Sequence, residues 1–385
     1  MKISKRNIYL IFTTFYIYFI MALFESSRGN FIPFFIDEFN TNNTTISFIL
    51  SLNTVGCVIG SFAGGHLCEK FGHKFVFISG SIISTAAIFM APFISNIYLL
   101  GLFYFIFGIG RSSLSVSVDS IVPVLSIGFE VILMNITHFM YGLGSFAGQS
   151  IYGKLLFNGI SWRSIYLYLG IFFIVSIIFT LFMKIPNMKI IQEHQAIQRK
   201  ELYKNPIIFL FMLAVSLQIM TEAVVNTWFI NYIRTSYALN PADAAIYASI
   251  FFLLFATGRL AGGFIVNKLG DAKGLRIFLL SAALCIFFGL ILKRSGLFLI
   301  SISGFFISIG FPTLMVLVNK TFKQNASFAI GLITTIGNII FVLLFNLSGF
   351  LNDLIGTYLS FFMAPAALIG SFIVITVISK KANLN

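Results

Sequence analysis

A string of thirteen residues early in the chain returns about half a chain length later, within a sequence that is otherwise almost continuously apolar. GSFAGGHLCEKFG begins at Gly60 and GRLAGGFIVNKLG begins at Gly258, in a chain of 385 residues. Six of the thirteen positions are identical. Duplicated halves in a membrane protein are typical of secondary transporters, whose substrate site lies between the halves. The repeat therefore predicts an architecture and a class of activity together.

The composition places most of the chain in lipid. Hydrophobic residues make up 58% of the sequence and charged residues only 10%, which is too few charges to cover the surface of a soluble protein. A helix that spans a bilayer needs about 20 apolar residues. Cutting the sequence at its polar and glycine- or proline-rich breaks predicts an all-α integral membrane protein with twelve transmembrane helices. The predicted spans are 8–36, 44–68, 75–94, 97–122, 131–157, 162–184, 206–233, 243–267, 275–293, 296–319, 325–351 and 356–379.

The longest break divides the twelve helices into six plus six. We expect an N-terminal six-helix bundle over residues 1–184, a cytoplasmic linker over 185–205 and a C-terminal six-helix bundle over 206–385. Isoleucines at helical spacing among charged residues in the linker fit an amphipathic helix on the inner membrane surface. A flexible charged linker fits the same residues.

The net charge of +13 follows from the membrane topology. Seventeen of the 25 Lys and Arg residues lie at alternate breaks, and only five lie at the opposite ones. Because an excess of Lys and Arg marks the cytoplasmic side, we expect a multi-pass plasma-membrane protein with both termini cytoplasmic. This distribution excludes a nucleic-acid-binding surface and leaves the lipid bilayer as the main partner of a monomer.

The repeated string forms the loop between the second and third helix of each half. The small residues before the loop allow neighbouring helix backbones to approach closely. Gly72 and Gly270 suit the tight turn that follows. The acidic position between them differs, because the first copy has Glu69 and the second has Asn267.

This loop resembles a motif of the major facilitator superfamily, written G-x-L-a-D-r-x-G-r-k, which falls on Gly65 to Lys74 and less fully on Gly263 to Ala272. The resemblance implies two pseudo-symmetric six-helix halves and transport by alternating access. It also implies that the loop holds a cytoplasmic gate, in which the acid faces a helix N-terminus. The gating residues implied are Gly65, Glu69, Lys70, Gly72, Arg259, Gly263, Lys268 and Gly270.

A second stretch, from Asn135 through His138 to Gln149 and then Trp162-Arg163, is similar to the sugar-porter branch that includes the fucose permease. The proline that this branch has near Gln149 is absent here. The branch resemblance implies a sugar substrate carried together with a proton.

Six ionisable residues fall within the predicted spans, namely Glu25, Arg28, Arg111, Asp119, Glu222 and Arg259. An unpaired charge at mid-bilayer costs about 2.5–3.5 kcal/mol on insertion scales, so such residues pair, face water or change protonation state. Glu25 and Arg28, at i and i+3, form either a local ion pair or a cavity-lining donor and acceptor. Arg111 lies about 12 Å along the helix axis from Asp119, too far to pair with it. It is either a substrate-binding group or a tether to another helix.

Polar stripes on two further helices add candidates. Glu222 and Asn226 continue from Gln218 at i+4 spacing, and a stripe of this kind either faces water or joins helices. His138 is either a titrating or a neutral hydrogen-bonded histidine. Arg259 fits a structural anchor and an anion-binding site equally well.

We predict a secondary active transporter that moves a small polar solute, either a sugar or an organic anion, in symport with protons. No G-x-x-x-x-G-K-[ST] nucleotide-binding loop is present, so a gradient must supply the energy. The substrate-binding candidates are Glu25, Arg28, Arg111, Asn135, His138, Glu222, Asn226 and Asn338. The proton-coupling candidates are Glu25, Asp119 and Glu222.

Other function classes fit the sequence less well. A drug or metabolite efflux pump of the same fold is the main alternative, although three intramembrane arginines argue against a purely cationic drug. Four scattered histidines and three scattered cysteines supply neither a catalytic cluster nor a metal site, so no enzyme, cofactor or metal is expected. A transport-dead sensor would carry an added domain, and none is visible.

Overall fold

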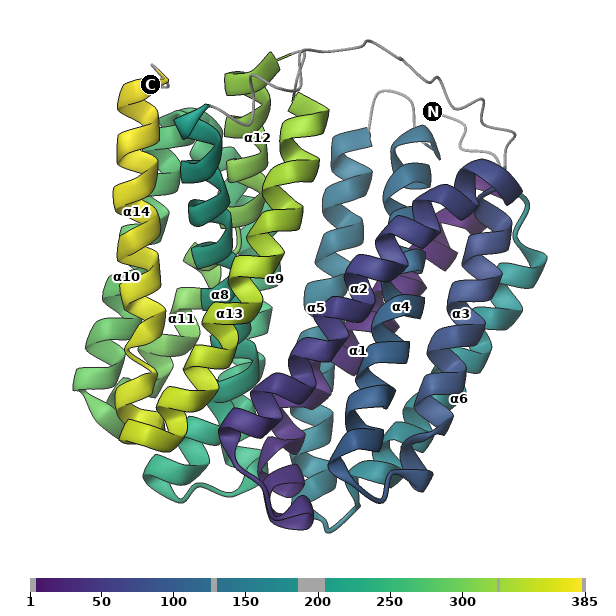
Figure 1. Ribbon diagram of the computed structural model, residues 1–385, viewed down its shortest axis with the longest axis horizontal. Helices are drawn as coiled ribbons and strands as arrows, with labels where there is room; N and C mark the ends of the chain where they lie inside the picture. The colour runs from purple at the N-terminus through teal and green to yellow at the C-terminus, as the bar shows by residue number, and fades with distance from the viewer. Residues whose placement is uncertain (1–4, 126–129, 186–204, 324–325, 383–385) are drawn as a thin grey trace. The chain divides into compact units, whose positions relative to one another are not determined.

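The computed structural model describes residues 5–125, 130–185, 205–323 and 326–382, and over these residues the protein is helical without strands (Figure 1). The linker expected over 185–205 lies outside the described residues except at its two ends. The first half of the chain forms six long helices. They are α1 (Lys5–Phe39), α2 (Asn43–Phe71), α3 (His73–Phe89), α4 (Ile97–Ile121), α5 (Glu130–Phe157) and α6 (Trp162–Phe182).

The second half repeats this arrangement with one helix in two pieces. Its helices are α8 (Pro206–Tyr237), α9 (Pro241–Leu269), α10 (Asp271–Ile291), α11 (Leu297–Ile307), α12 (Gly310–Phe322), α13 (Ala326–Ser360) and α14 (Met363–Lys381). Eleven segments of the described residues are long and apolar enough to cross a membrane, with α11 and α12 counted as one. The eleven do not include α5, whose 28 residues make about 42 Å of helix. The predicted all-α membrane fold is therefore confirmed.

The chain divides into two compact units. The first unit is Met1–Ile191 with Asn240–Ser249, and the second unit is Gln192–Leu239 with Ile250–Asn385. The start of α9 thus groups with the first unit. The domain boundaries predicted from the sequence stay predictions.

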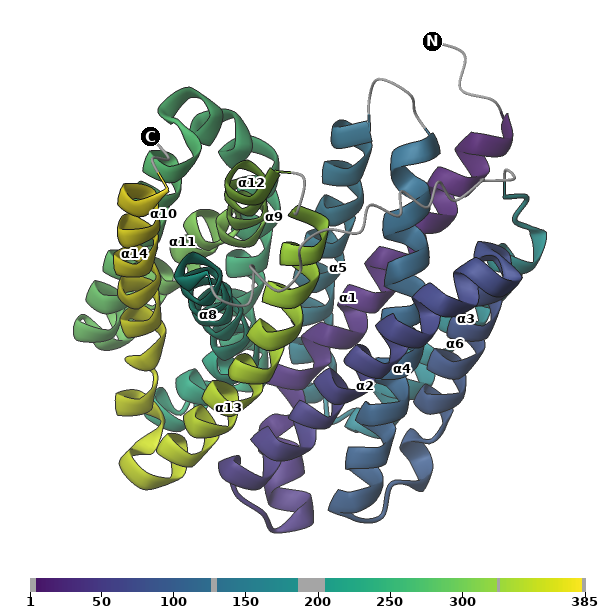
Figure 2. The same cartoon turned by 45° about the horizontal axis from the view of Figure 1, so that its top comes forward.

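Glycines bring α2 and α4 into backbone contact, and the two helices lie side by side in both views (Figures 1 and 2). A Cβ atom at Gly60 would overlap the carbonyl oxygen of Ile109, and a Cβ atom at Gly108 would overlap that of Asn53. Because a backbone cannot move aside as a side chain can, α2 and α4 form a rigid pair. The close approach predicted from the small residues of the repeat is observed here.

The second unit makes the same two contacts between α9 and α11. A Cβ atom at Gly258 would press on the carbonyl oxygen of Phe305, and one at Gly304 would overlap that of Phe251. The repeat therefore conserves helix packing as well as sequence.

A second rigid pair in the first unit consists of α1 and α5. A Cβ atom at Gly144 of α5 would overlap the carbonyl oxygen of Phe19 on α1. Phe24 of α1 reaches the other pair and stacks on Phe107 of α4, with ring centroids 3.4 Å apart. Apolar contacts of this kind set the position of α1 relative to α4.

The tenth predicted span, 296–319, is broken where a single helix was expected. Pro312 has no N–H to donate to the carbonyl of Ser308, and its ring crowds that carbonyl. The helix accordingly ends at Ile307 and restarts at Gly310. Gln218 of α8 packs at the break, and its amide nitrogen Nε2 donates to the carbonyl oxygen of Ile307 at 3.0 Å.

Candidate functional site

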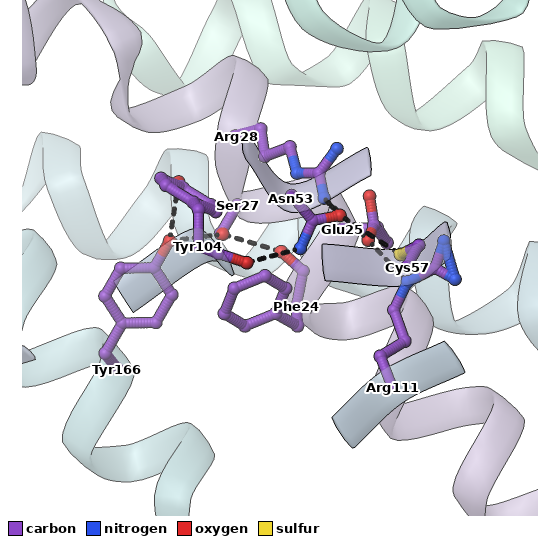
Figure 3. A network of polar contacts seen from close by, with 9 residues as sticks. All are labelled: Phe24, Glu25, Ser27, Arg28, Asn53, Cys57, Tyr104, Arg111 and Tyr166. Carbon is purple, nitrogen blue, oxygen red and sulfur yellow. Dashed lines mark hydrogen bonds and ion pairs between the residues drawn. The ribbon is translucent and has the colours of Figure 1, made fainter. Parts of the chain in front are cut away.

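Three charged side chains meet where α1 faces α4 in the first unit (Figure 3). Glu25 and Arg28 lie one helical turn apart on α1, and Nη2 of Arg28 is 2.8 Å from Oε1 of Glu25. Arg111 of α4 places its Nε 2.9 Å from the same oxygen. The structure therefore adds Arg111 to the Glu25–Arg28 pair that the sequence suggested, and Arg111 tethers α4 to α1.

The three side chains are buried to different extents. Glu25 is 6% exposed, Arg28 is 14% exposed and Arg111 is 25% exposed. The Nε–Oε1 contact of Arg111 is an ion pair without the alignment of a hydrogen bond. Since charge-assisted hydrogen bonds weaken as they bend, Arg111 is the less firmly held of the two arginines.

Asn53 of α2 completes the cluster, and the sequence analysis did not select it. Its Oδ1 accepts a hydrogen bond of 2.6 Å from Nη2 of Arg28, and its Nδ2 donates to the carbonyl oxygen of Tyr104 at 2.9 Å. The thiol of Cys57 lies beside it, with Sγ 3.7 Å from Oδ1. Only 2% of Asn53 is exposed.

The guanidinium group of Arg28 lies over the aromatic ring of Tyr104. Its guanidinium carbon lies 5.6 Å from the ring centroid of Tyr104. The Tyr104 hydroxyl is 3.1 Å from that of Tyr166 on α6, which is 2.9 Å from Oγ of Ser27. A chain of buried hydroxyl groups thus fixes the ring under Arg28 from three helices.

The charges of this cluster do not cancel. One carboxylate and two guanidinium groups leave a formal charge of +1 when Glu25 is ionised. A buried charge without a partner is costly, so this arrangement favours an anion as a further partner.

Asp119 lies in a different setting on α4. The hydroxyl of Tyr18 donates to its Oδ1 in a very short hydrogen bond, and Ser115 donates to its Oδ2 at 3.2 Å. Among the described residues, no cation lies within ion-pair distance of Asp119. His138 of α5 packs edge-on against the Tyr18 ring, with centroids 5.4 Å apart. Two of the predicted residues therefore meet through Tyr18, which the sequence analysis did not select.

The second unit holds Glu222 on α8 and Arg259 on α9. The charge of Arg259 acts on Glu222, but the described part of the chain gives Glu222 no ion pair. The Arg259 guanidinium lies over the Phe255 ring at 4.6 Å, and its buried Nε lacks a hydrogen-bond partner. Asn226 and Asn338 are half-buried on α8 and α13. The side chain of Asn135, on α5, is not among those described.

The loop residues of the repeat divide into two groups. Gly72 and Gly270 have φ of 83° and 86° and turn the chain between helices, a conformation that favours glycine. By contrast, a Cβ atom at Gly65 or Gly263 would meet nothing within 4 Å. These two positions therefore make no close approach to another helix.

The charged loop residues make few contacts. Glu69, Lys70 and Lys268 are exposed, and none of the three forms an ion pair with a described residue. In the second unit Asp271, just after the repeated string, pairs with Lys320 of α12 at 2.5 Å. An acidic residue therefore lies four positions after Asn267, and it forms an ion pair, which Glu69 of the first copy does not form with a described residue.

The Trp162-Arg163 pair forms a staple at the end of α6. Glu38 of α1 accepts from Nε1 of Trp162 at 2.8 Å and pairs with Nη2 of Arg163 at 2.5 Å. The same nitrogen of Arg163 donates to the carbonyl oxygen of Ile94. This staple joins three segments of the first unit.

Comparisons with known proteins agree with this fold. A sequence profile of the Major Facilitator Superfamily matches residues 14–343 and, in a second match, residues 212–383. The chain is 25% identical over 338 residues to "Probable nitrate transporter NarT" of Staphylococcus carnosus (strain TM300), which covers 85% of this chain and 82% of that protein. It is 24% identical over 286 residues to "Nitrite extrusion protein" of Bacillus subtilis (strain 168), covering 71% and 70% of the two chains.

A solved structure gives the same fold. The crystal structure of a D-xylose-proton symporter aligns with a TM-score of 0.78 at 13% identity and covers 96% of each chain. With the profile match over most of the sequence, the chain belongs to the Major Facilitator Superfamily and is a multi-pass membrane transporter, not an enzyme.

Proposed function

We propose that the protein is a proton-coupled secondary active transporter of a small anion, working by alternating access. The observation that carries the proposal is the cluster of Glu25 with Arg28 and Arg111, whose net charge is +1. An inorganic or organic anion would bring that charge to zero. Guanidinium groups also suit planar oxyanions, because their donors form a fixed fork.

The sequence left a sugar and an anion open as substrates, and the charge of the cluster favours the anion. A neutral sugar needs hydrogen-bond donors and acceptors but leaves the excess charge uncompensated. The names of two relatives, a nitrate transporter and a nitrite extrusion protein, point the same way. The likeness to a sugar symporter at 13% identity concerns the fold.

Glu25 supplies the coupling in this proposal. When its carboxylate takes up a proton, the charge of the cluster rises from +1 to +2 and the affinity for an anion increases. By linkage, a bound anion must raise the affinity of Glu25 for the proton by the same factor. The proton and the anion therefore each favour the binding of the other. Carrying both across the membrane in one cycle is symport.

We assign supporting roles to the remaining candidates. Asp119 is a second proton-binding residue. The charge of Arg111, which pairs with Glu25, also acts on Asp119. In the second unit Glu222, Asn226 and Asn338 are assigned to substrate binding, with Arg259 as an additional anion-binding group. Asn135 and His138 keep their predicted substrate-binding roles, and the repeated loop keeps its predicted gating role. We also propose a plasma-membrane location with cytoplasmic termini.

The test is transport into liposomes that contain the purified protein. Nitrate, nitrite and D-xylose would be offered outside, with and without an inward proton gradient, and internal pH would be followed with a trapped dye. We expect gradient-driven uptake of an anion with simultaneous acidification, and a KM for the anion that falls as the external pH falls. Uptake of D-xylose alone, or anion uptake indifferent to the gradient, would refute the proposal. Proton-driven export would support the efflux alternative.

A further inference from the structure

The two carboxylate oxygens of Glu25 are used unequally. Oε1 receives both Nη2 of Arg28 at 2.8 Å and Nε of Arg111 at 2.9 Å. Oε2 has no hydrogen bond or ion pair with any residue that the structure describes, since both contacts of Glu25 go to Oε1. This is unusual, because an arginine beside a carboxylate commonly engages both oxygens.

Asn53 accounts for the one-sided pairing. Nη2 of Arg28 carries two hydrogens, and it has two acceptors, Oε1 of Glu25 and Oδ1 of Asn53 at 2.6 Å. Both hydrogens of Nη2, the nitrogen through which Arg28 contacts Glu25, therefore already have acceptors. The buried Nε of Arg28 has no hydrogen-bond partner, so the guanidinium is not oriented to maximise its contacts with Glu25.

The amide of Asn53 cannot turn away from Arg28. Its Nδ2 donates to the carbonyl oxygen of Tyr104, which can only accept a hydrogen bond, so Oδ1 must face the opposite way. The backbone of Asn53 is held as well, because its own carbonyl lies against Gly108 of α4. Asn53 is thus a fixed acceptor on the rigid α2–α4 pair.

We propose that Asn53 is a positioning residue for proton uptake at Glu25. It holds Arg28 to a single oxygen of the carboxylate and so leaves Oε2 open to a proton. In the step itself a hydronium ion gives its proton to Oε2, an O–H bond forms, water is released and the carboxylate becomes a neutral acid. The inference rests on the proposed coupling role of Glu25.

Other groups also act on Glu25 and must stay constant in a test. Two cations, Arg28 and Arg111, pair with it directly. The titratable groups of neighbouring helices that interact electrostatically with Glu25 are Cys57 of α2, Tyr104 of α4 and Tyr166 of α6. On α5, Tyr141 acts through Arg111. A substitution at position 53 replaces none of these residues, but Arg28, Cys57 and Tyr104 each lose a contact to the Asn53 side chain, which the comparison of two variants must take into account.

The test is an infrared titration of the Glu25 carboxyl group in the purified full-length protein, which needs no substrate. The band of the protonated acid is identified by its loss in Glu25→Gln. In Asn53→Ala, Arg28 has lost its second acceptor and should engage Oε2, so we expect the midpoint to move by about one pH unit to lower pH. In Asn53→Asp, a variant of the same size, the new carboxylate neutralises Arg28. The midpoint should then move to higher pH, measured against the Glu25→Gln/Asn53→Asp double variant.

The opposite directions distinguish positioning from packing. A general disturbance of the helix would move both variants in the same direction, and that result would overturn the proposal, as would an unchanged midpoint in both. Ser51→Ala is the matched control, because it removes a buried hydrogen bond to Ser47 on the same helix and should leave the midpoint in place. If Asn53→Ala does not fold, a shift of Asn53→Asp to lower pH or no shift overturns the proposal.

Nitrate uptake separates this inference from the proposed function. If the wild type shows no proton-driven anion uptake but the two midpoints move in opposite directions, the transport proposal fails and the positioning role stands. If the wild type transports nitrate with protons and the midpoints do not move, the positioning role alone fails.

Discussion

The first helix of each half carries a glutamate inside its apolar span, buried in the case of Glu25 and half-buried in the case of Glu222, and the two differ in their partners. Glu25 in the first unit has two guanidinium groups within 2.9 Å of one oxygen. Glu222 in the second unit has Arg259 as its electrostatic neighbour, without an ion pair to any described residue. The packing of neighbouring helices is the same at two points, since matching glycine contacts join α2 to α4 and α9 to α11. Duplication has thus preserved these glycine contacts and not the charges.

The matching contacts show which residues correspond. Because Gly108 meets Asn53 and Gly304 meets Phe251, an apolar residue takes the place of the amide. Counting along α4 and α11 from the same contacts, Ile307 takes the place of Arg111. The carbonyl of Ile307 receives the Gln218 amide at the helix break. At the position that corresponds to Arg111 and its ion pair with Glu25, the second unit therefore has an uncharged hydrogen bond from the Gln218 amide to the backbone of Ile307.

Substituting the two glutamates gives the largest expected difference between the units. Glu25→Gln should abolish gradient-driven accumulation of nitrate in liposomes, because the cluster would keep its charge of +2 at every pH. Glu222→Gln should weaken binding or coupling less than about tenfold, since no ion pair is lost, and should leave folding intact. Equal losses in both variants would show that the two carboxylates have the same role.

Glycine substitutions test the shared packing. Gly60→Ala and Gly258→Ala should each destabilise the protein by about 1–3 kcal/mol, because the added Cβ meets a backbone carbonyl. Gly65→Ala and Gly263→Ala are the matched controls and have open space at the added atom. Thermal unfolding in detergent measures all four. If one unit alone is destabilised, the packing is not equivalent.

Substitutions of Arg111 and Arg259 should differ in their effect on the KM for nitrate. Arg111→Gln reduces the charge of the cluster from +1 to zero, and we expect the KM for nitrate to rise about tenfold, equivalent to about 1.4 kcal/mol. Arg259→Gln removes a charge that lies over an aromatic ring and should raise KM by a smaller factor. A larger effect of Arg259→Gln would place the main anion contact in the second unit.

The smallest effect concerns the repeated loop. Lys320 is 59% exposed, so its pair with Asp271 should contribute less than about 1 kcal/mol. Lys320→Ala should therefore lower the unfolding temperature only slightly, and Lys70→Ala, which breaks no ion pair with a described residue, should lower it even less. A large loss of stability in Lys320→Ala would assign the pair a structural role that exposed pairs do not have.

The sequence predicted the fold well, because lipid imposes long apolar segments and the repeat marks the two halves. It missed the break between α11 and α12, although Pro312 was the available signal. A proline in an apolar helix can kink or interrupt it, and the outcome depends on a neighbour such as Gln218, which donates to the carbonyl oxygen of Ile307 at the break.

The candidate site was predicted in part. Charges inside apolar helices identified the Glu25–Arg28 pair and, apart from it, Arg111, because burying a charge is costly wherever it occurs. Their convergence on one oxygen depends on how α1 packs against α4, which periodicity does not reveal. Asn53 and Tyr18 were missed for a related reason, since a single uncharged polar residue in an apolar helix is common, and its partner lies on another helix.

The rigid pairing of helices in the first unit has a mechanical consequence. Glu25 and Arg28 belong to the α1–α5 pair, whereas Asn53 and Arg111 belong to the α2–α4 pair. The contacts from Arg28 to Asn53 and from Arg111 to Glu25 therefore bridge the same seam, and they share a single coordinate, the separation of the two pairs. A displacement along that coordinate stretches both contacts at once. The two contacts across the seam would then break as one cooperative event, while Arg28 stays paired with Glu25 on α1. A pair of spectroscopic labels on α1 and α2 would record this event as a two-state change in distance.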